Sequence, residues 1–169
     1  MTTVFEASAA GIFKGPGIEF RCAIGKGGMT DAASKREGDG TSPIGAWEMR
    51  RVYYRSDKIE VPETGLQTIV LSPHDGWCDD PSDPFYNRSI ALPFSASHEK
   101  LWRDDDVYDI IVELGHNDNP PVPGLGSAIF LHVAKTDYEP TEGCIALNEK
   151  DLRSALAIAK PGSVLSITR

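Results

Sequence analysis

The stretch from Gly126 to Leu147 decides the fold and the chemistry of this chain, and it reads GSAIFLHVAKTDYEPTEGCIAL. Ala128–Leu131 is a short apolar run after a glycine and a serine, which predicts a strand. His132 ends the run, and a polar loop with a proline separates it from Gly143-Cys144. A histidine on a rigid strand can then face a cysteine on a tight turn, and a base near a thiol is the basic unit of nucleophilic catalysis.

The residue types in this stretch fit specific chemical roles. A free thiol is only a few per cent ionised at neutral pH, and a neighbouring imidazolium lowers its pKa. The backbone carbonyl of Val133 is expected to fix the tautomer of His132. Gly143 permits a turn that aims the N–H groups of Gly143 and Cys144 at one point, as in an oxyanion hole. The alternative is a hydrogen-bonded histidine and an inert buried cysteine, and residue types alone leave both open.

Bulk properties restrict the class of protein. The chain has 169 residues with 40% hydrophobic and 25% charged residues, which predicts a single globular domain over residues 1–169. A net charge of -8 argues against a nucleic-acid partner. A local basic spot at Arg50, Arg51 and Arg55 still leaves room for an anionic cell-wall polymer. No apolar run is long enough for a membrane span, and the N-terminus resembles no secretory signal.

The remaining pattern predicts a mostly β protein. Asn148 is a good N-cap for a helix in which four apolar residues recur at helical spacing, and Pro161-Gly162 ends it. The segments Gly25–Gly40 and Ser72–Arg103 are predicted as polar loops, and Thr41–Gly45 as a tight turn. We expect a β-sandwich or closed barrel with one helix after Cys144. Strands are predicted at Val4–Ala7, Ile18–Ile24, Ala46–Tyr54, Gln67–Leu71, Val107–Leu114 and Ser163–Thr168.

Three cysteines leave at least one unpaired. Cys22 alternates with apolar residues and is expected as a buried structural thiol, whereas Cys78 falls in the polar segment. The sequence leaves open whether Cys22 and Cys78 form a disulfide. Cys144 is the cysteine with a candidate partner.

The order and spacing of the two site residues resemble a known family. His132 precedes Cys144 by twelve residues, and His132 with Thr141-Glu142-Gly143-Cys144-Ile145 resembles the signature of the L,D-transpeptidase (YkuD-like) catalytic domain. Ser42-Pro43-Ile44-Gly45 resembles its Thr-Pro-x-Gly turn. The blocks Gly76–Pro81, Tyr86–Arg88 and Leu101–Arg103 resemble a short proteobacterial branch of the family.

This resemblance implies a cysteine acyl-enzyme that needs no metal or organic cofactor. Its members attack an amide of a peptidoglycan stem peptide and pass the acyl group to an amine of a neighbouring stem. Cys144 is then the nucleophile, His132 the general base and later acid, and Gly143 with Cys144 the oxyanion hole. Such a substrate implies a periplasmic location and acylation of Cys144 by carbapenems.

Three positions depart from the family pattern. Val133 stands where a glycine often follows the histidine, Glu142 where a histidine is common, and Ala146 where an arginine is common. The departures leave open which stem-peptide amide is attacked, including one nearer the L-alanine end. They also leave open hydrolysis of the same acyl-enzyme by an L,D-carboxypeptidase or endopeptidase, and a non-catalytic cell-wall binding module.

Other residues are candidates for substrate contact. Arg88 and Asn87 are expected to bind a stem-peptide carboxylate, and Thr141 and Glu142 lie beside the thiol. Four aromatic residues are candidates for lining a groove, with at least two of them expected in the core: Trp77, Phe85, Tyr86 and Trp102. The acidic residues around Cys78 fit no zinc pattern, so no metal site is predicted. His98 and His116 are expected as surface or hydrogen-bonded histidines.

Overall fold

The computed structural model describes residues 1–169, and strands dominate it. The strands are β1 (Val4–Ser8), β2 (Ile12–Gly15), β3 (Ile18–Arg21), β4 (Met29–Asp31), β5 (Ser42–Tyr54), β6 (Thr68–Val70), β7 (Asp75–Cys78), β8 (Ser89–Ala91), β9 (His98–Lys100), β10 (Ile110–Leu114), β11 (Phe130–Val133), β12 (Ile145–Leu147) and β13 (Val164–Thr168). The helices are α1 (Glu149–Ile158) and two single 3-10 turns, η1 (Ala32–Ser34) and η2 (Thr136–Tyr138).

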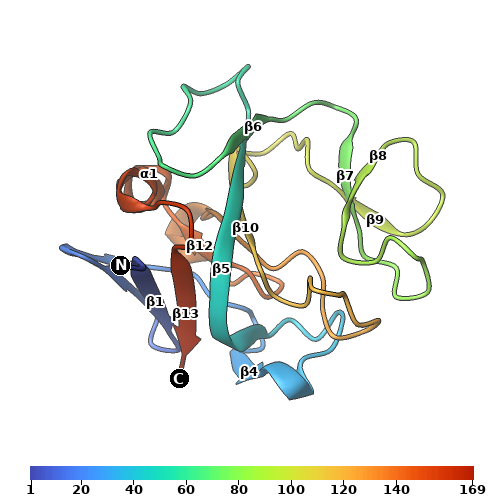
Figure 1. Ribbon diagram of the computed structural model, residues 1–169, viewed down its shortest axis with the longest axis horizontal. Helices are drawn as coiled ribbons and strands as arrows, with labels where there is room; N and C mark the ends of the chain where they lie inside the picture. Colours follow the sequence, from blue (N-terminus) through green and yellow to red (C-terminus); the bar gives the residue numbers. More distant parts are fainter.

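Ten strands form one sheet that curls into a nearly closed barrel. Their order is β12-β11-β10-β5-β13-β1-β2-β3, with β4 and β6 also paired to β5. The two ends of this order meet, because Ala23 and Ala146 exchange backbone hydrogen bonds of 2.8 and 3.1 Å. The long strand β5 runs through the centre of the molecule and joins the two halves (Figure 1). The predicted mostly β barrel with one helix is therefore confirmed.

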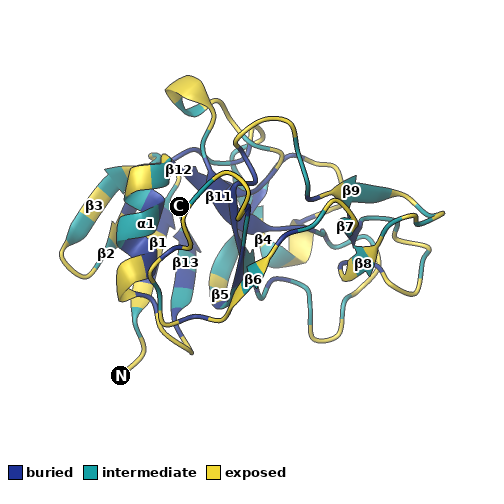
Figure 2. Ribbon diagram, turned by 90° about the horizontal axis from the view of Figure 1, so that it is seen from above, coloured by how far each residue is buried: buried dark blue, intermediate teal, exposed yellow.

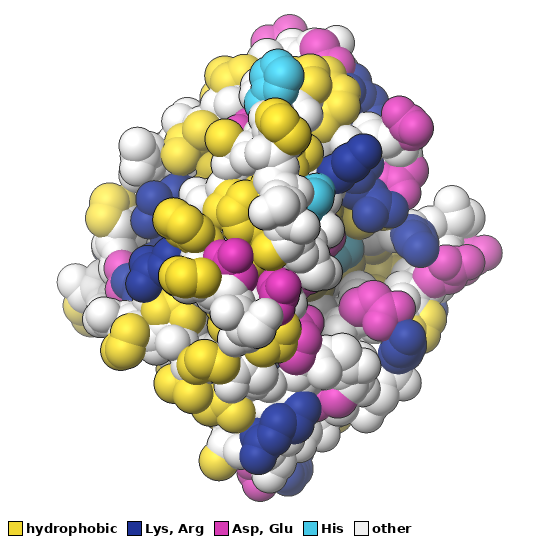
Figure 3. Space-filling view, turned by 90° about the vertical axis from the view of Figure 1, so that its right-hand side faces the viewer, with side chains coloured by type: hydrophobic (Ala, Val, Ile, Leu, Met, Phe, Trp, Pro, Cys, Tyr) yellow, Lys and Arg dark blue, Asp and Glu magenta, His cyan; other side chains and the backbone are white.

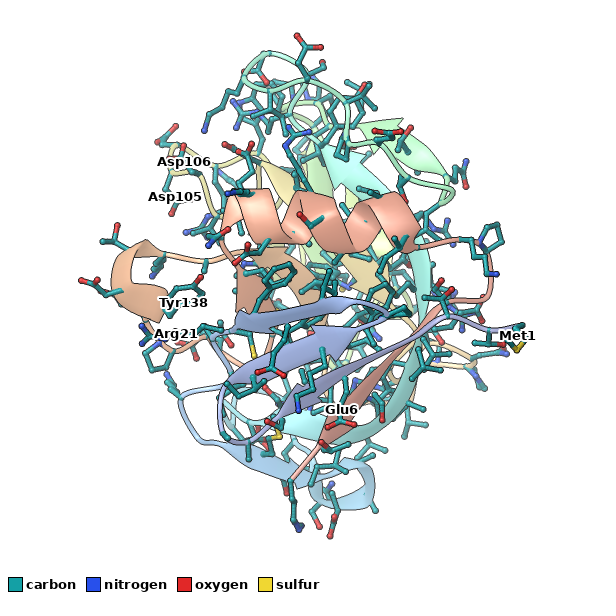
Figure 4. The ribbon with its side chains drawn as sticks, turned by 90° about the vertical axis from the view of Figure 1, so that its left-hand side faces the viewer. Met1, Glu6, Arg21, Asp105, Asp106 and Tyr138 are labelled. Carbon is teal, nitrogen blue, oxygen red and sulfur yellow. The ribbon has the colours of Figure 1, made fainter.

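The one α-helix closes the seam of the barrel. The side chain of Asn148 accepts a hydrogen bond of 2.8 Å from the backbone N–H of Asp151, as the sequence predicted for the N-cap. Leu152, Ala155 and Leu156 are buried against β3, β11 and β12, and Figure 4 shows α1 lying across the strands. Each buried leucine contributes about 2 kcal/mol to this packing.

Two hydrophobic cores share the central strands. The larger lies inside the barrel, where α1 and the strands bury Phe5, Leu131 and Ile145, among others. The smaller lies on the opposite face of β10 and β11, between the barrel and the small sheet. It contains Phe130 and Cys144. Figure 2 shows the buried residues gathered in these central strands. Because β10 and β11 bury both faces, their sequences are continuous apolar runs rather than alternating ones.

The segment Ser72–Arg103, predicted as a polar loop, contains a second sheet. Strands β8, β7 and β9 pair in that order, beside the barrel (Figure 1). The strands are only three or four residues long, and their polar outer positions hide the alternation. Cys78, predicted in a loop, ends β7 and is fully buried.

Three further sequence predictions need correction. The Gly25–Gly40 segment contains β4 and η1 as well as loops, and β2 was not predicted. The predicted turn at Thr41–Gly45 is instead the start of β5, because Ser42–Ile44 pairs in parallel with β4. β4 is an added edge strand, so its pairing leaves no periodic pattern in the sequence.

The cysteines carry no disulfide, since Cys22, Cys78 and Cys144 are all free thiols. Burial raises the pKa of Cys22 to about 11, which fits the predicted structural role.

A cation–π contact connects η2 to the end of β3. The guanidinium of Arg21 lies 4.7 Å from the ring centre of Tyr138 (Figure 4).

Candidate active site

The parallel pairing of β11 and β12 places four site residues on one face of the barrel. His132 is opposite Ala146 in this pairing, and Leu131 is opposite Ile145. Side chains alternate between faces, so Leu131 and Ile145 enter the main core, whereas Phe130, His132, Cys144 and Ala146 share the other face. Cys144 immediately precedes β12 and lies beside Phe130, whose backbone N–H is 3.3 Å from the sulfur. The structure thus brings together the histidine and cysteine that the sequence singled out.

The tautomer of His132 is fixed by its own strand. Its Nδ1 lies 2.9 Å from the carbonyl oxygen of Val133, and a carbonyl only accepts, so Nδ1 carries the proton. The other ring nitrogen, Nε2, is then the basic one. The ring also packs edge-on against Tyr108, with 5.3 Å between the ring centres. The backbone role predicted for Val133 is confirmed by this contact.

The thiol of Cys144 has a different partner from the one expected. Its sulfur donates to the carbonyl oxygen of Ala128 at 3.2 Å, and no hydrogen bond joins it to His132. Ala128 has φ of 53° and lies before β11, so it falls outside the observed strand although the sequence predicted it as the first strand residue. Catalytic hydrogen bonds are often unmade in free enzymes and form when substrate binds. Transfer of the thiol proton to His132 therefore requires the thiol to leave Ala128.

The resting pair is neutral. Burial raises the pKa of Cys144 to about 12, although the N–H of Phe130 lowers it. Burial also lowers the pKa of His132 to about 4, against the bond to Val133, which raises it. The sequence suggested an imidazolium that lowers the thiol pKa, and the structure contradicts this for the free protein. The pair fits general-base activation during attack instead of a preformed thiolate.

The turn before the thiol needs a glycine. Gly143 has φ of 139°, and a Cβ on it would lie 2.7 Å from the backbone oxygen of Thr41. Its N–H donates to the hydroxyl of Thr141 at 3.0 Å, and that hydroxyl donates to the carbonyl of Cys144 at 2.6 Å. The Gly143 N–H, predicted as one oxyanion donor, is therefore occupied by Thr141, and of the two predicted donors only the N–H of Cys144 remains free.

Ser42 sets the direction of that free N–H. Its hydroxyl donates to the carbonyl oxygen of Gly143 at 2.8 Å and accepts from the N–H of Gly25 at 2.9 Å. In a trans peptide the carbonyl and the following N–H point in opposite directions. Since Ser42 holds the Gly143 carbonyl on one side, the N–H of Cys144 points to the other. Ser42 is fully buried, so water does not compete for these bonds.

A cavity of about 410 Å³ opens over the site. Cys144, His132 and Ala146 belong to its wall, together with aromatic and charged residues from distant segments. Acidic and basic side chains gather around a hollow on the face that carries the small sheet (Figure 3). The charged residues that line the cavity are Lys35, Glu37, Asp79, Glu99, Arg103, Lys135, Glu139 and Glu142.

The predicted substrate-binding residues separate into two groups. Thr141 and Glu142 lie in the cavity wall, and Glu142 forms an exposed ion pair of 2.8 Å with Lys26. Trp77, Tyr86, Asn87 and Arg88 do not line the cavity. The side chain of Arg88 is exposed outside it.

Asn87, Trp77 and Tyr86 support the site from behind. The side-chain oxygen of Asn87 accepts from the Trp77 indole at 2.9 Å and from the Ala128 N–H at 3.0 Å, so it fixes the residue that holds the thiol. The hydroxyl of Tyr86 bonds to Glu37 at 2.6 Å and to the N–H of Gly126 at 3.0 Å. These side chains are buried, in agreement with the expectation that at least two of the four aromatic candidates pack in the core.

Sequence reasoning missed Glu99, Tyr108 and Ser42 as site residues. Tyr108 was assigned to the apolar strand, and Glu99 lies in the segment predicted as a loop. In the sequence, Ser42 stands only in a predicted turn that resembles a family motif. Its position 101 residues before Gly143 gives no local signal of a contact.

Neither a metal centre nor a membrane span is visible. No group of three or more His, Cys, Asp or Glu side chains is arranged to hold a metal ion. None of the helices is long and apolar enough to cross a membrane.

Comparison with known proteins identifies a family through one sequence model. The sequence model of the YkuD family, the L,D-transpeptidase catalytic domain, matches residues 12–167. Similar solved structures include L,D-transpeptidase 1 (13% identity, TM-score 0.46) and L,D-transpeptidase 3 with a faropenem-derived adduct (14% identity, TM-score 0.49), both from Mycobacterium tuberculosis. Each match covers 99% of this chain but 60% of the other, so the chain spans about three fifths of those structures. No curated protein matches. By the extent of the sequence match, the chain belongs to the L,D-transpeptidase catalytic domain family.

Proposed function

We propose that the protein is a peptidoglycan L,D-transpeptidase that forms stem-peptide crosslinks through an acyl-enzyme on Cys144. The observation that carries the proposal is the pairing of β11 with β12, which places His132 and Cys144 on one face of a cavity of about 410 Å³. A cavity of this size is in the range of ligand sites and accommodates part of a peptide.

In the first half-reaction His132 acts as base and then as acid. Its Nε2 takes the thiol proton as the sulfur of Cys144 attacks the carbonyl carbon of the donor amide, and a C–S bond forms. The N–H of Cys144 donates to the resulting oxyanion, a contact worth a factor of about 10² to 10³ in rate. His132 then gives its proton to the leaving nitrogen as the C–N bond breaks. A thioester remains on Cys144.

In the second half-reaction an amine replaces the sulfur. The amine loses a proton to His132 as the new C–N bond forms, and the sulfur takes that proton as the C–S bond breaks. Water in place of the amine gives hydrolysis, the reaction of an L,D-carboxypeptidase or endopeptidase. The two activities share one intermediate, and the products distinguish them.

Acylation tests the site directly. We expect a carbapenem to add its mass once to the intact wild-type protein, because a β-lactam carbonyl acylates an activated thiol. Cys144→Ala abolishes the addition, and His132→Ala slows it by a factor of about 10² to 10⁴. Cys22→Ala is the matched control, since Cys22 is a buried thiol outside the cavity, and this variant acylates as wild type does. An unmodified wild-type mass would contradict the proposed site.

Product analysis tests the reaction. Purified muropeptides incubated with the protein should yield crosslinked dimers, and fragment masses identify the stem amide that is attacked. Trimmed stems without dimers would support the hydrolase. Turnover absent in wild type, with unchanged binding of Cys144→Ala to the cell wall, would support a binding module. We also propose that the protein acts in the periplasm, where this substrate lies, and cell fractionation tests it.

A further inference from the structure

The carboxylate of Glu99 enters the active-site cavity from the small sheet. Glu99 lies on β9 opposite Trp77 of β7 and lines the cavity together with Cys144 and His132. One of its oxygens accepts a hydrogen bond from the hydroxyl of Tyr108. The other oxygen has no hydrogen-bond partner, and no cation forms an ion pair with Glu99. The cavity therefore contains a carboxylate with one free oxygen.

Glu99 differs from the carboxylates at the rim of the cavity. Glu142 pairs with Lys26 at 2.8 Å, and Glu139 lies 3.7 Å from Lys135. These rim carboxylates are already balanced by cations. Glu99 is held by a neutral phenol instead, so its charge is available to a ligand.

Two other acidic residues of the wall are also without a cation. Glu37 accepts from the hydroxyls of Tyr86 and Ser127, and Asp79 accepts from Ser97 at 2.6 Å. Burial is the largest cause that raises the pKa of Glu99, and Asp79 and Glu37 raise it further. The hydroxyl of Tyr108 and the guanidinium of Arg103 act in the opposite direction, but Arg103 forms its ion pair with Asp105 and not with Glu99. This part of the cavity favours a ligand with a positive charge.

Glu99 also lies close to the reacting groups. The ring of Tyr108 that holds Glu99 packs edge-on against His132, with 5.3 Å between the ring centres. After burial, which raises the pKa of Cys144, and the N–H of Phe130, which lowers it, the charge of Glu99 is the next cause and raises it further. The negative charge of Glu99 therefore hinders formation of a thiolate on Cys144 in the first half-reaction. We therefore looked to the second half-reaction for a role of the Glu99 carboxylate.

In the second half-reaction the Glu99 carboxylate has a cation to bind, because the acceptor amine arrives as an ammonium near neutral pH. We infer that Glu99 binds the protonated amine of the acyl acceptor and thereby favours transfer of the acyl group to an amine over hydrolysis. This inference rests on the proposed acyl-enzyme at Cys144 and assigns a specificity-determining residue to it.

The protons balance in the following way. The acceptor ammonium loses two protons in forming an amide. Glu99 takes the first and releases it to solvent, which leaves a neutral amine. His132 takes the second as the C–N bond to the thioester carbon forms, and it passes to the sulfur of Cys144 as the C–S bond breaks. Because burial raises the pKa of Glu99, it is a stronger base than an ordinary carboxylate.

Glu99→Gln tests the inference, since glutamine keeps an oxygen that accepts from Tyr108 but removes the charge. We expect carbapenem acylation of Cys144 to be at least as fast as in wild type. With a donor muropeptide and an amine acceptor, the ratio of dimer to hydrolysed stem should fall by about tenfold or more. With hydroxylamine, a nucleophile that is uncharged near neutral pH, the ratio of transfer to hydrolysis should equal that of wild type.

Glu113→Gln is the matched control. Glu113 also accepts from a tyrosine hydroxyl, that of Tyr53 at 3.3 Å, and burial raises its pKa too. It differs in lying outside the cavity and in pairing with Arg51 at 2.7 Å. This control should keep the wild-type ratio with both nucleophiles.

Each other outcome has a defined meaning. An unchanged ratio in Glu99→Gln, an equal loss with hydroxylamine, or a loss of acylation overturns the inference and leaves the proposed function standing. A wild-type protein that hydrolyses its acyl-enzyme and never transfers it also overturns the inference. A wild-type protein that does not acylate refutes the proposed function itself.

Discussion

Ser42→Ala is the substitution that tests the geometry of the oxyanion site most directly. It removes the hydroxyl that donates to the Gly143 carbonyl and accepts from the N–H of Gly25. Two buried backbone groups lose their partner, at about 1 to 3 kcal/mol each, so we expect the free energy of unfolding to fall by about 2 to 6 kcal/mol. The peptide between Gly143 and Cys144 is then free to rotate, and its N–H no longer points at the oxyanion.

The catalytic loss should exceed what destabilisation explains. A displaced oxyanion donor lowers the rate of acylation by a factor of about 10² to 10³. The assay is the rate at which a carbapenem adds to Cys144, followed by intact mass at a temperature where the variant is fully folded. Thermal unfolding of each sample gives that temperature.

Two variants separate this effect from a general loss of stability. Ser163→Ala removes another fully buried hydroxyl, which accepts from the N–H of Lys160 at 2.9 Å outside the cavity, and it should lose stability but keep the acylation rate. Ser42→Thr keeps the hydroxyl and should recover most of the rate. Acylation of folded Ser42→Ala within about threefold of wild type would refute the reasoning.

Three further predictions concern the thiol and its surroundings. Alkylation of Cys144 by iodoacetamide should accelerate by about tenfold per pH unit between about pH 6 and 9, because burial raises its pKa to about 12; a flat profile by peptide mass spectrometry would indicate a preformed ion pair. Asn87→Ala should lower the free energy of unfolding in urea by at least about 3 kcal/mol, since it leaves the Trp77 indole and the Ala128 N–H unpaired. Burial holds the pKa of His116 at about 4 against 6.5, so folding stability is lost as pH falls from about 6.5 to 4, and His116→Gln should reduce that loss by about 3 kcal/mol.

The elements of the barrel could be predicted where the local sequence alone shows an apolar run or a helix cap. The run Ala128–Leu131 and the Asn148 cap mark β11 and α1 in the sequence itself, although β11 begins two residues later than expected. Ala128 is displaced from the strand because Asn87 accepts its N–H, and this contact spans 41 residues. Such long-range contacts leave no local signal.

The residue pair of the candidate active site could be proposed from the sequence, but its resting state could not. The order of His132 and Cys144, with the family resemblance, identified the pair. The neutral state of the pair depends on burial, and burial depends on the second core around Phe130 and Tyr108. That core forms only because β7, β8 and β9 pack beside the barrel, and their short strands were hidden in a polar segment.

His116 illustrates the same limit. Its polar sequence context predicts a surface or hydrogen-bonded histidine, yet it is buried, and its Nδ1 has no hydrogen-bond partner. Trp47 packs edge-on against its ring at 4.9 Å between centres. Burial here comes from the tertiary packing of a loop on the start of β5, which sequence periodicity does not report.

The two departures from the family pattern beside the thiol, Glu142 and Ala146, bring different groups to the cavity wall. Ala146 is buried, and its backbone forms two hydrogen bonds with Ala23 where the barrel closes. This position therefore helps to close the barrel and brings no charge to the cavity. After burial, the larger cause, two cations lower the pKa of His132: Arg103, from the segment between β9 and β10, and Lys135, just after β11. Glu142 is exposed and paired with Lys26, and exposed ion pairs of this kind contribute little to stability. On the proposed function, we therefore expect specificity at this site to come mainly from the segment that runs from β9 to β10, which is distant from the cysteine turn in the sequence.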